Sequence, residues 1–130
     1  MKITIDQPFD IPGSTPQQRK IGGGASHPTQ GLRYARAAWR ALVEPFAPAK
    51  PVPKRTAVRL LVRLHYHTDD HGLQGEYKTT RPDADNLLKI IKDAMTKAGF
   101  WEDDAQTQDT CLRYWTNYEE RVVIEAEEAE

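Results

Sequence analysis

The chain of 130 residues contains one cysteine and no apolar run near the about 20 residues that a membrane-spanning helix requires. The single thiol, Cys111, excludes an internal disulfide and a thiolate zinc cluster, which is typical of proteins from a reducing compartment. The first residues also lack the apolar segment of a secretion signal. We therefore expect a cytoplasmic protein without a membrane partner.

Other absences restrict the chemistry. The sequence has no Walker A loop, no nucleophile elbow and no paired-cysteine zinc motif, so a nucleotide cofactor is not expected. The formal net charge is only −1, but the charge is unevenly distributed. Residues 119–130 contain six Glu and one Arg, a net charge of −5, whereas residues 1–118 carry +4. A positive body with an acidic end is compatible with a polyanionic partner and does not require one.

Hydrophobic periodicity predicts one α+β domain spanning residues 1–130, with a mixed sheet of about four strands and two helices packed on it. The strands on either side of the second helix form a parallel pair if they are neighbours, and the last two strands form an antiparallel hairpin. The expected elements, in the order β-α-β-α-β-β, are Lys2–Ile5, Gly31–Phe46, Thr56–Thr68, Asp85–Ala98, Thr107–Thr116 and Arg121–Ala126. Residues 119–130 are thus the last strand and an acidic tail.

Residues 12–31 are rich in Gly, Pro, Ser, Thr and Gln, which predicts a mobile loop. The loop carries Arg19 and Lys20. It is either a surface loop that happens to be basic or an arm that becomes ordered against a phosphate backbone.

The strand predicted over Thr56–Thr68 alternates apolar side chains with largely basic ones, so its two faces differ. His65 and His67 share the basic face, and His71 follows after a turn. Three histidines could ligate zinc, but the sequence supplies no convincing fourth ligand, and histidines on a strand need no metal.

Acidic residues flank the second predicted helix. Asp83 and Asp85 stand at its start, and Glu102-Asp103-Asp104 follow its end. Oxygen ligands of this kind suit hard cations such as Mg²⁺. The alternative is that the first two are helix caps stabilised by the helix dipole, and that Asp85, Lys89 and Asp93, at steps of four, form a surface ion-pair ladder.

The pair Asp83-x-Asp85 does not begin an EF-hand loop. The third ligand position of such a loop is Leu87 here, and the required glycine position is Leu88. What remains is an all-oxygen site made by Asp83 and Asp85 together with Asp103 or Asp104.

The same residues resemble those of the RusA-type Holliday-junction resolvases. The resemblance rests on three ordered segments, which are RPDADNLLK at 81–89, DAM at 93–95 and KAGFWEDDAQ at 97–106. One departure is that Pro82 occupies the place of the family's basic residue before the first Asp, with Arg81 one position earlier.

The resemblance implies a homodimeric endonuclease that uses Mg²⁺, with Mn²⁺ as a substitute, and nicks four-way DNA junctions in paired, symmetric fashion during recombination and repair. By motif position, Asp83, Asp85 and Asp104 hold the metal and Lys89 is the catalytic lysine. Contact with DNA is expected at Arg19, Lys20 and Arg81. Such proteins are encoded by bacteria and their phages.

Two other functions remain open. One is a metal-dependent nuclease or phosphohydrolase that prefers flaps or nucleotides. The other is a non-catalytic module that binds junctions or a protein partner, in which the Asp residues are only caps and ion pairs. Loss of metal-dependent cleavage on Asp85→Asn separates the enzymes from the binding module.

Overall fold

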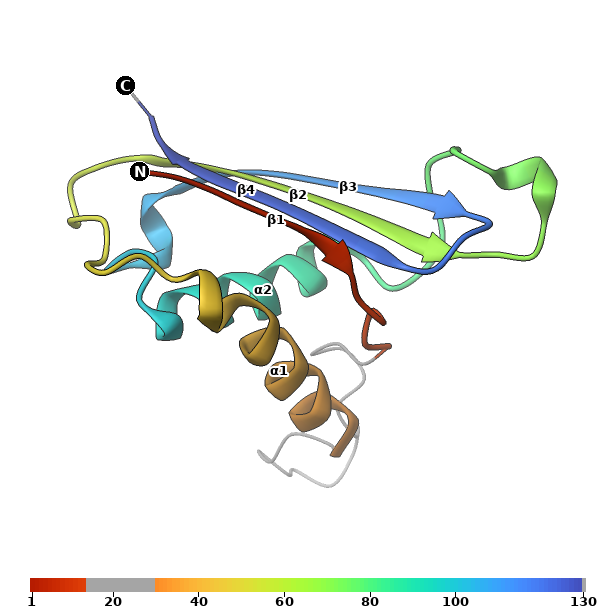
Figure 1. The fold of residues 1–130 in the computed structure, drawn as a ribbon, viewed down its shortest axis with the longest axis horizontal. Coiled ribbons are helices and arrows are strands. Elements are labelled where there is room, and N and C mark those ends of the chain that lie inside the picture. The colour runs from red at the N-terminus through yellow and green to blue at the C-terminus, as the bar shows by residue number, and fades with distance from the viewer. Residues whose placement is uncertain (14–29, 130) are drawn as a thin grey trace.

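A computed structural model describes residues 1–13 and 30–129 of the chain as a four-stranded sheet with both long helices on one of its faces (Figure 1). The predicted α+β class and element count are confirmed. Most of the predicted loop 12–31, including Arg19 and Lys20, lies outside the described residues. The elements are β1 (Lys2–Pro8), α1 (Gln30–Val43), β2 (Val58–His67), α2 (Ala84–Ala98), β3 (Thr107–Thr116) and β4 (Arg121–Glu128), with short 3-10 helices η2 (Glu44–Phe46), η3 (His71–Leu73) and η4 (Asp104–Gln106).

The strand order is β1-β4-β2-β3. The predicted parallel pair is confirmed, because β2 and β3 run side by side from Val58 opposite Thr107 to His67 opposite Thr116. The predicted terminal hairpin is wrong, because β4 lies between β1 and β2 and is antiparallel to both. The side chains explain this order. The central strand β4 buries Val122, Ile124 and Ala126, whereas β3 carries polar residues at 108–110 and stands at the edge, where polar side chains remain solvated.

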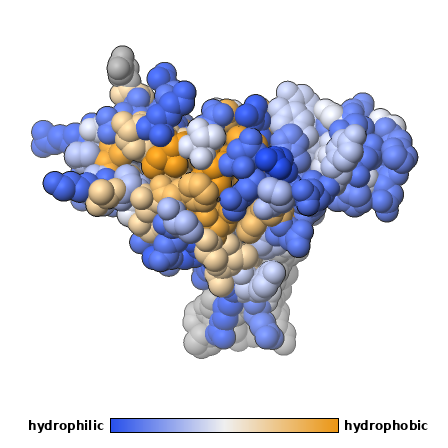
Figure 2. Space-filling view, viewed as in Figure 1, coloured by the Kyte–Doolittle hydropathy of each residue, from blue (hydrophilic) through white to orange (hydrophobic). Residues whose placement is uncertain are grey.

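The core lies between the sheet and the two helices. Helix α1 buries the five side chains that its periodicity predicts, and α2 does the same with its apolar stripe. The buried α1 residues are Leu32, Ala35, Trp39, Leu42 and Val43. In the orientation of Figure 1, Figure 2 shows apolar surface between the sheet and α1 and hydrophilic side chains on the connection after β2. No helix from the described residues lies on the opposite face of the sheet.

Helix α2 begins and ends as the sequence predicts. Gly99 takes the left-handed conformation with φ 94°, and its N–H donates to the carbonyls of Met95 and Thr96, which closes the helix. Phe100 and Trp101 follow directly and are buried, so they anchor the chain as it leaves the helix. Within the described residues, none of the helices has the length and apolar character needed to cross a membrane.

Candidate active site

Helix α2 lies along the edge strand β3 and brings Asp85 close to it. The evidence is the environment of Cys111, on the face of β3 that α2 covers. Burial raises the pKa of the Cys111 thiol to about 11, the guanidinium of Arg113 opposes that rise, and the carboxylates of Asp85 and Asp109 add to it. Acidic groups from the start of α2 and from β3 therefore both act on this thiol.

The three predicted metal-binding carboxylates are free of competing contacts. Asp83 stands at the N-cap position of α2, yet its side chain makes no capping hydrogen bond. Within the described residues, the side chains of Asp83, Asp85 and Asp104 accept no hydrogen bond and form no ion pair. Asp83 thus occupies the cap position without a capping hydrogen bond, and Asp85 lies in the first turn of the helix. Their position at the positive end of the helix dipole still favours a negative charge.

The structure distinguishes the two aspartates of the second acidic segment. The Asp103 carboxylate accepts the N–H of Ala105 at 2.9 Å and forms a capping box with Gln106 at the start of η4. The Asp103 carboxylate is therefore already engaged in capping η4. The exposed neighbour Asp104 is directed into a groove on α2, which makes it the available member of the pair.

Two adjoining grooves on α2 hold the acidic residues. One, of about 270 Å³, is lined by Asp85, Leu88, Lys89, Lys92 and Asp109. The other, of about 460 Å³, is lined by Arg36, Lys89, Ile90, Lys92, Asp93, Lys97 and Asp104. Because both grooves contain Lys89 and Lys92, Asp85 and Asp104 lie on two sides of these lysines.

The lysines of the grooves differ in their partners. Lys92 pairs with Asp109 at 2.8 Å, in a partly buried contact that leaves 19% and 22% of the two side chains exposed. Lys97 pairs with Asp93 at 3.1 Å, so Asp93 is not the partner of Lys89 that the step of four suggested. Lys89 has no ion pair with any residue that the structure describes, which leaves its charge available to a ligand.

Lys78 and Arg113 donate hydrogen bonds to the turn that precedes Asp83. The buried ammonium of Lys78 donates to the Thr80 hydroxyl at 2.5 Å and to the Arg81 carbonyl at 2.9 Å. From β3, Arg113 donates to the Thr80 carbonyl at 2.9 Å and also to the Pro82 carbonyl. The Arg81–Pro82 peptide bond is cis, and the Arg81 side chain is exposed.

The environment of Lys78 is unusual for a lysine. Its ammonium lies 4.4 Å from the centre of the Trp115 ring and 5.2 Å from that of Tyr66, and no described carboxylate pairs with it. Burial lowers the pKa of Lys78, and the nearby Arg113 charge lowers it further. Burying this charge costs free energy, so its two hydrogen bonds to the turn are the compensating contacts.

Gln106 fixes the second acidic segment. Its side-chain amide donates to the carbonyls of Val52 at 3.3 Å, Pro53 at 2.7 Å and Thr56 at 2.9 Å. Its side-chain oxygen accepts the backbone N–H groups of residues 102 and 103 at 3.1 and 2.9 Å. This buried side chain thus joins the connector before β2 to the turn that carries Asp104.

Sequence reasoning missed several of these residues as parts of the site. They are Lys78, Lys92, Gln106, Asp109 and Arg113. One available signal was the polar character of Asp109 and Arg113 at alternate positions of the strand, on the face that an adjacent helix covers. The contacts of Lys78 and Gln106 join residues whose sequence positions carry no shared pattern.

The donor atoms suit a hard divalent cation, although they are not gathered around one point. Asp83, Asp85 and Asp104 offer unpartnered carboxylate oxygens, which are the ligands that Mg²⁺ prefers. Among residues 1–13 and 30–129, no three acidic, histidine or cysteine side chains are close enough to hold one ion. Oxygen donors of the type that Mg²⁺ prefers are thus present, but Asp85 and Asp104 line separate grooves.

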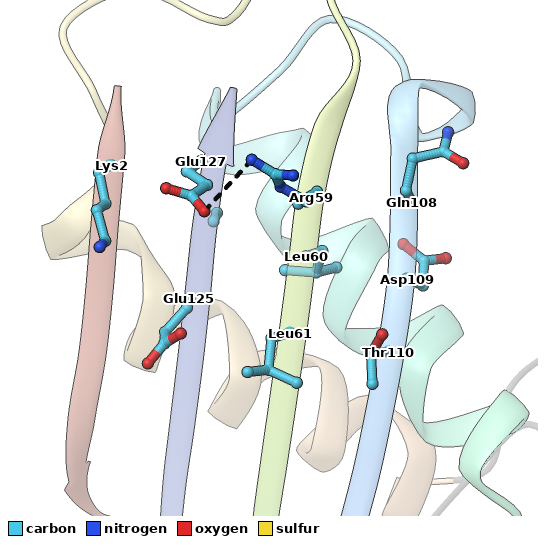
Figure 3. Close-up of a pocket in the computed structure, with 10 residues that line it drawn as sticks. Lys2, Arg59, Leu60, Leu61, Gln108, Asp109, Thr110, Glu125 and Glu127 are labelled. Atoms are coloured by element: carbon cyan, nitrogen blue, oxygen red, sulfur yellow. Dashed lines mark ion pairs between the residues drawn. The ribbon is translucent and has the colours of Figure 1, made fainter. Parts of the chain in front are cut away.

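A third hollow lies on the uncovered face of the sheet (Figure 3). It measures about 480 Å³ and is lined by Lys2, Arg59, Leu60, Leu61, Gln108, Asp109, Thr110, Glu125, Ala126 and Glu127. Its arginine is already paired, because Arg59 lies 3.8 Å from Glu127 across the strands. This hollow contains none of the predicted catalytic residues.

Comparison with known proteins points to one family. The sequence model of the family described as Endodeoxyribonuclease RusA matches residues 8–127. A crossover junction endodeoxyribonuclease of Lactococcus phage r1t is 36% identical over 59 residues, which are 45% of this chain and 45% of that protein. Proteins of the same name from Escherichia coli (strain K12) and Enterobacteria phage 82 are each 43% identical over 53 residues, 41% of this chain and 38% of theirs. The chain thus spans less than half the length of these curated relatives.

Proposed function

Because the chain belongs to the RusA family of endodeoxyribonucleases, we propose that it resolves four-way DNA junctions by paired, symmetric nicks that depend on Mg²⁺. The observation that carries the proposal is that two carboxylates without a partner among the described residues line adjoining grooves, which share a lysine without an ion pair there. Asp85 lines the groove on the first half of α2, Asp104 lines the groove that continues along the same helix to Lys97, and both grooves contain Lys89. In metal-assisted phosphodiester hydrolysis, carboxylates hold the ion and a nearby cation can stabilise the developing negative charge.

The roles of the residues follow from their positions. Asp83, Asp85 and Asp104 would hold Mg²⁺, or Mn²⁺ in its place. When bound, the ion supplies a water of lowered pKa and offsets negative charge on the scissile phosphate. Lys89, which has no ion pair with the described residues, would stabilise the negative charge that develops on the phosphate.

The DNA backbone is expected to follow the grooves away from the acids toward α1. A smaller groove of about 220 Å³ between the helices is lined by Arg36, Ala37, Arg40, Ile90, Asp93, Ala94 and Lys97. Arg40 is paired with Glu44 at 3.1 Å, whereas Arg36 has no ion pair among the described residues and lines both this groove and the larger one. Arg36 is thus the cation best placed to contact a phosphate beside the active site.

Paired cleavage of a junction requires two active sites. We expect them from a homodimer, whose two-fold axis would coincide with that of the junction. We expect the enzyme to act on bacterial or phage DNA in the cytoplasm.

The test compares a four-way junction, a matched duplex and a flap, each incubated with the protein in Mg²⁺ or EDTA. We expect paired nicks in the junction alone, and none in EDTA. Equal cutting of all three DNAs would replace the proposal with a general metal nuclease. Tight junction binding without cutting would replace it with a binding module.

Lys78→Met should slow cleavage by about 10- to 100-fold, which is typical of losing a residue that supports metal ligands. The change removes the ammonium that donates hydrogen bonds to the Thr80 hydroxyl and the Arg81 carbonyl. The turn before Asp83 is then less rigid, and the position of the Asp83 carboxylate is less well defined. The measurement is the Mg²⁺ concentration that gives half-maximal cleavage, which should rise. Lys50→Met, at an exposed position of the connector, serves as the control and should leave that concentration unchanged.

A further inference from the structure

Three aromatic rings form a row on the face of the sheet opposite α1 and α2. His65 of β2 stacks on Tyr114 of β3 with ring centres 5.2 Å apart and planes inclined by 17°. Tyr77, from the connection between β2 and α2, stacks on the other side of Tyr114 at 5.1 Å and 26°. We name these three residues the aromatic row. Tyr77 is its outer member and is 62% exposed.

The backbone holds Tyr77 firmly in this position. Tyr77 forms an isolated bridge with Tyr114, and the N–H of Lys78 donates to the Arg113 carbonyl at 2.9 Å. Glu76 and Trp115 add a further bond of 2.9 Å from the Trp115 N–H to the Glu76 carbonyl. The segment therefore runs along the open edge of β3 like a short extra strand. The Tyr77 ring is therefore exposed to solvent while its backbone is held by hydrogen bonds to β3.

Two arginines near the aromatic row have carboxylate partners. Arg63, which acts on both His65 and Tyr114, lies 3.6 Å from Glu125. Arg121 lies 2.6 Å from Asp6. Among the described residues, the two arginines near the aromatic row are thus already paired, and the exposed ring surface suits an uncharged, flat partner. A nucleobase is such a partner, since every base has a π-face.

The aromatic row and the acidic motif lie at the same level of β3, on opposite sides of the sheet. Consecutive residues of a strand point to opposite faces, so Tyr114 points to the uncovered face and Arg113 to the face with α2. There Arg113 holds the Pro82 carbonyl, next to Asp83. A DNA strand with a phosphate at the acidic motif reaches Tyr77 by passing around the edge of β3.

We propose that Tyr77, supported by Tyr114 and His65, stacks on an unpaired base of the DNA substrate close to the cleaved strand. The proposal rests on the proposed nuclease function and adds the feature by which the protein distinguishes a junction from a duplex. Bases within a duplex stack on one another, so an exposed ring gains most from a base that has left its pair. Such bases arise where strands exchange.

The test uses a four-way junction with 2-aminopurine at the point of strand exchange, bound in EDTA so that it is not cut. The variants are Tyr77→Ala, Tyr77→Phe, which keeps the ring, and the control Tyr118→Ala, which removes a tyrosine that is 75% exposed. We expect the wild-type protein, Tyr77→Phe and Tyr118→Ala to quench the fluorescence of the bound junction. Tyr77→Ala should leave it bright and bind the junction about 5- to 100-fold more weakly, with duplex affinity unchanged.

Each outcome decides one question. Equal quenching and affinity for Tyr77→Ala and the wild-type protein would overturn the stacking role, and junction cleavage in Mg²⁺ would leave the nuclease function intact. A wild-type protein that neither prefers the junction nor cuts it would overturn both. Circular dichroism of Tyr77→Ala checks that the fold is retained, and Tyr77→Phe tests the ring if it is not.

Discussion

Asp85→Asn should reduce junction cleavage by about 10³-fold or more, the scale of losing a group that acts directly in the transition state. The substitution keeps the shape of the side chain and removes its charge. Because the carboxylate has no hydrogen bond or ion pair within the described residues, the fold loses no contact with it. Stability and junction binding should therefore stay near those of the wild-type protein. Single-turnover kinetics measure the cleavage rate, and a gel-shift assay in EDTA measures junction binding.

The same helix supplies a matched control. Asp93 is also an exposed aspartate of α2, but it pairs with Lys97 and stands two helical turns farther from the start of the helix. Asp93→Asn should cleave at close to the wild-type rate. Wild-type cleavage by Asp85→Asn would remove Asp85 from the active site, and equal losses in both variants would point to a general effect of charge on α2.

Gln106→Leu should lower the free energy of unfolding by about 2–4 kcal/mol, because it leaves several buried backbone groups without a partner. The Gln106 side chain donates to the carbonyls of Val52, Pro53 and Thr56, and it accepts the N–H groups of residues 102 and 103. Leucine fills a similar volume but can form none of these hydrogen bonds. Urea denaturation measures the loss. Cleavage should fall as well, even where the protein is fully folded, since the turn that carries Asp104 loses its anchor.

Gln108→Leu tests whether the effect belongs to the contacts of Gln106. Gln108 is the next glutamine along the chain and is exposed on β3. An exposed substitution away from such contacts usually changes stability by about 0.5 kcal/mol or less. If Gln106→Leu were as stable and as active as Gln108→Leu, the network around Gln106 would have no part in holding the site.

The sequence by itself determined the local elements and the acidic motif. The spacing of apolar residues predicted the buried faces of both helices, and Gly99 predicted the end of α2, because helix periodicity and capping depend on residues within a few positions of one another. The strand–helix–strand order also predicted the parallel pair of β2 and β3. Asp83, Asp85, Lys89 and Asp104 stand together in the sequence as an ordered motif, so they were found without the fold.

Only the tertiary structure decided how these elements are paired and which side chains are free. Strand periodicity gives the face of a strand but not its neighbour, so the position of β4 between β1 and β2 contradicted the expected hairpin. Nor does adjacency in the sequence show that Asp103 caps η4 while Asp104 remains available. The contacts of Lys92 with Asp109, and of Lys78 and Arg113 with the turn before Asp83, join residues that local spacing cannot relate. Their geometry exists only after the helix has packed against the sheet.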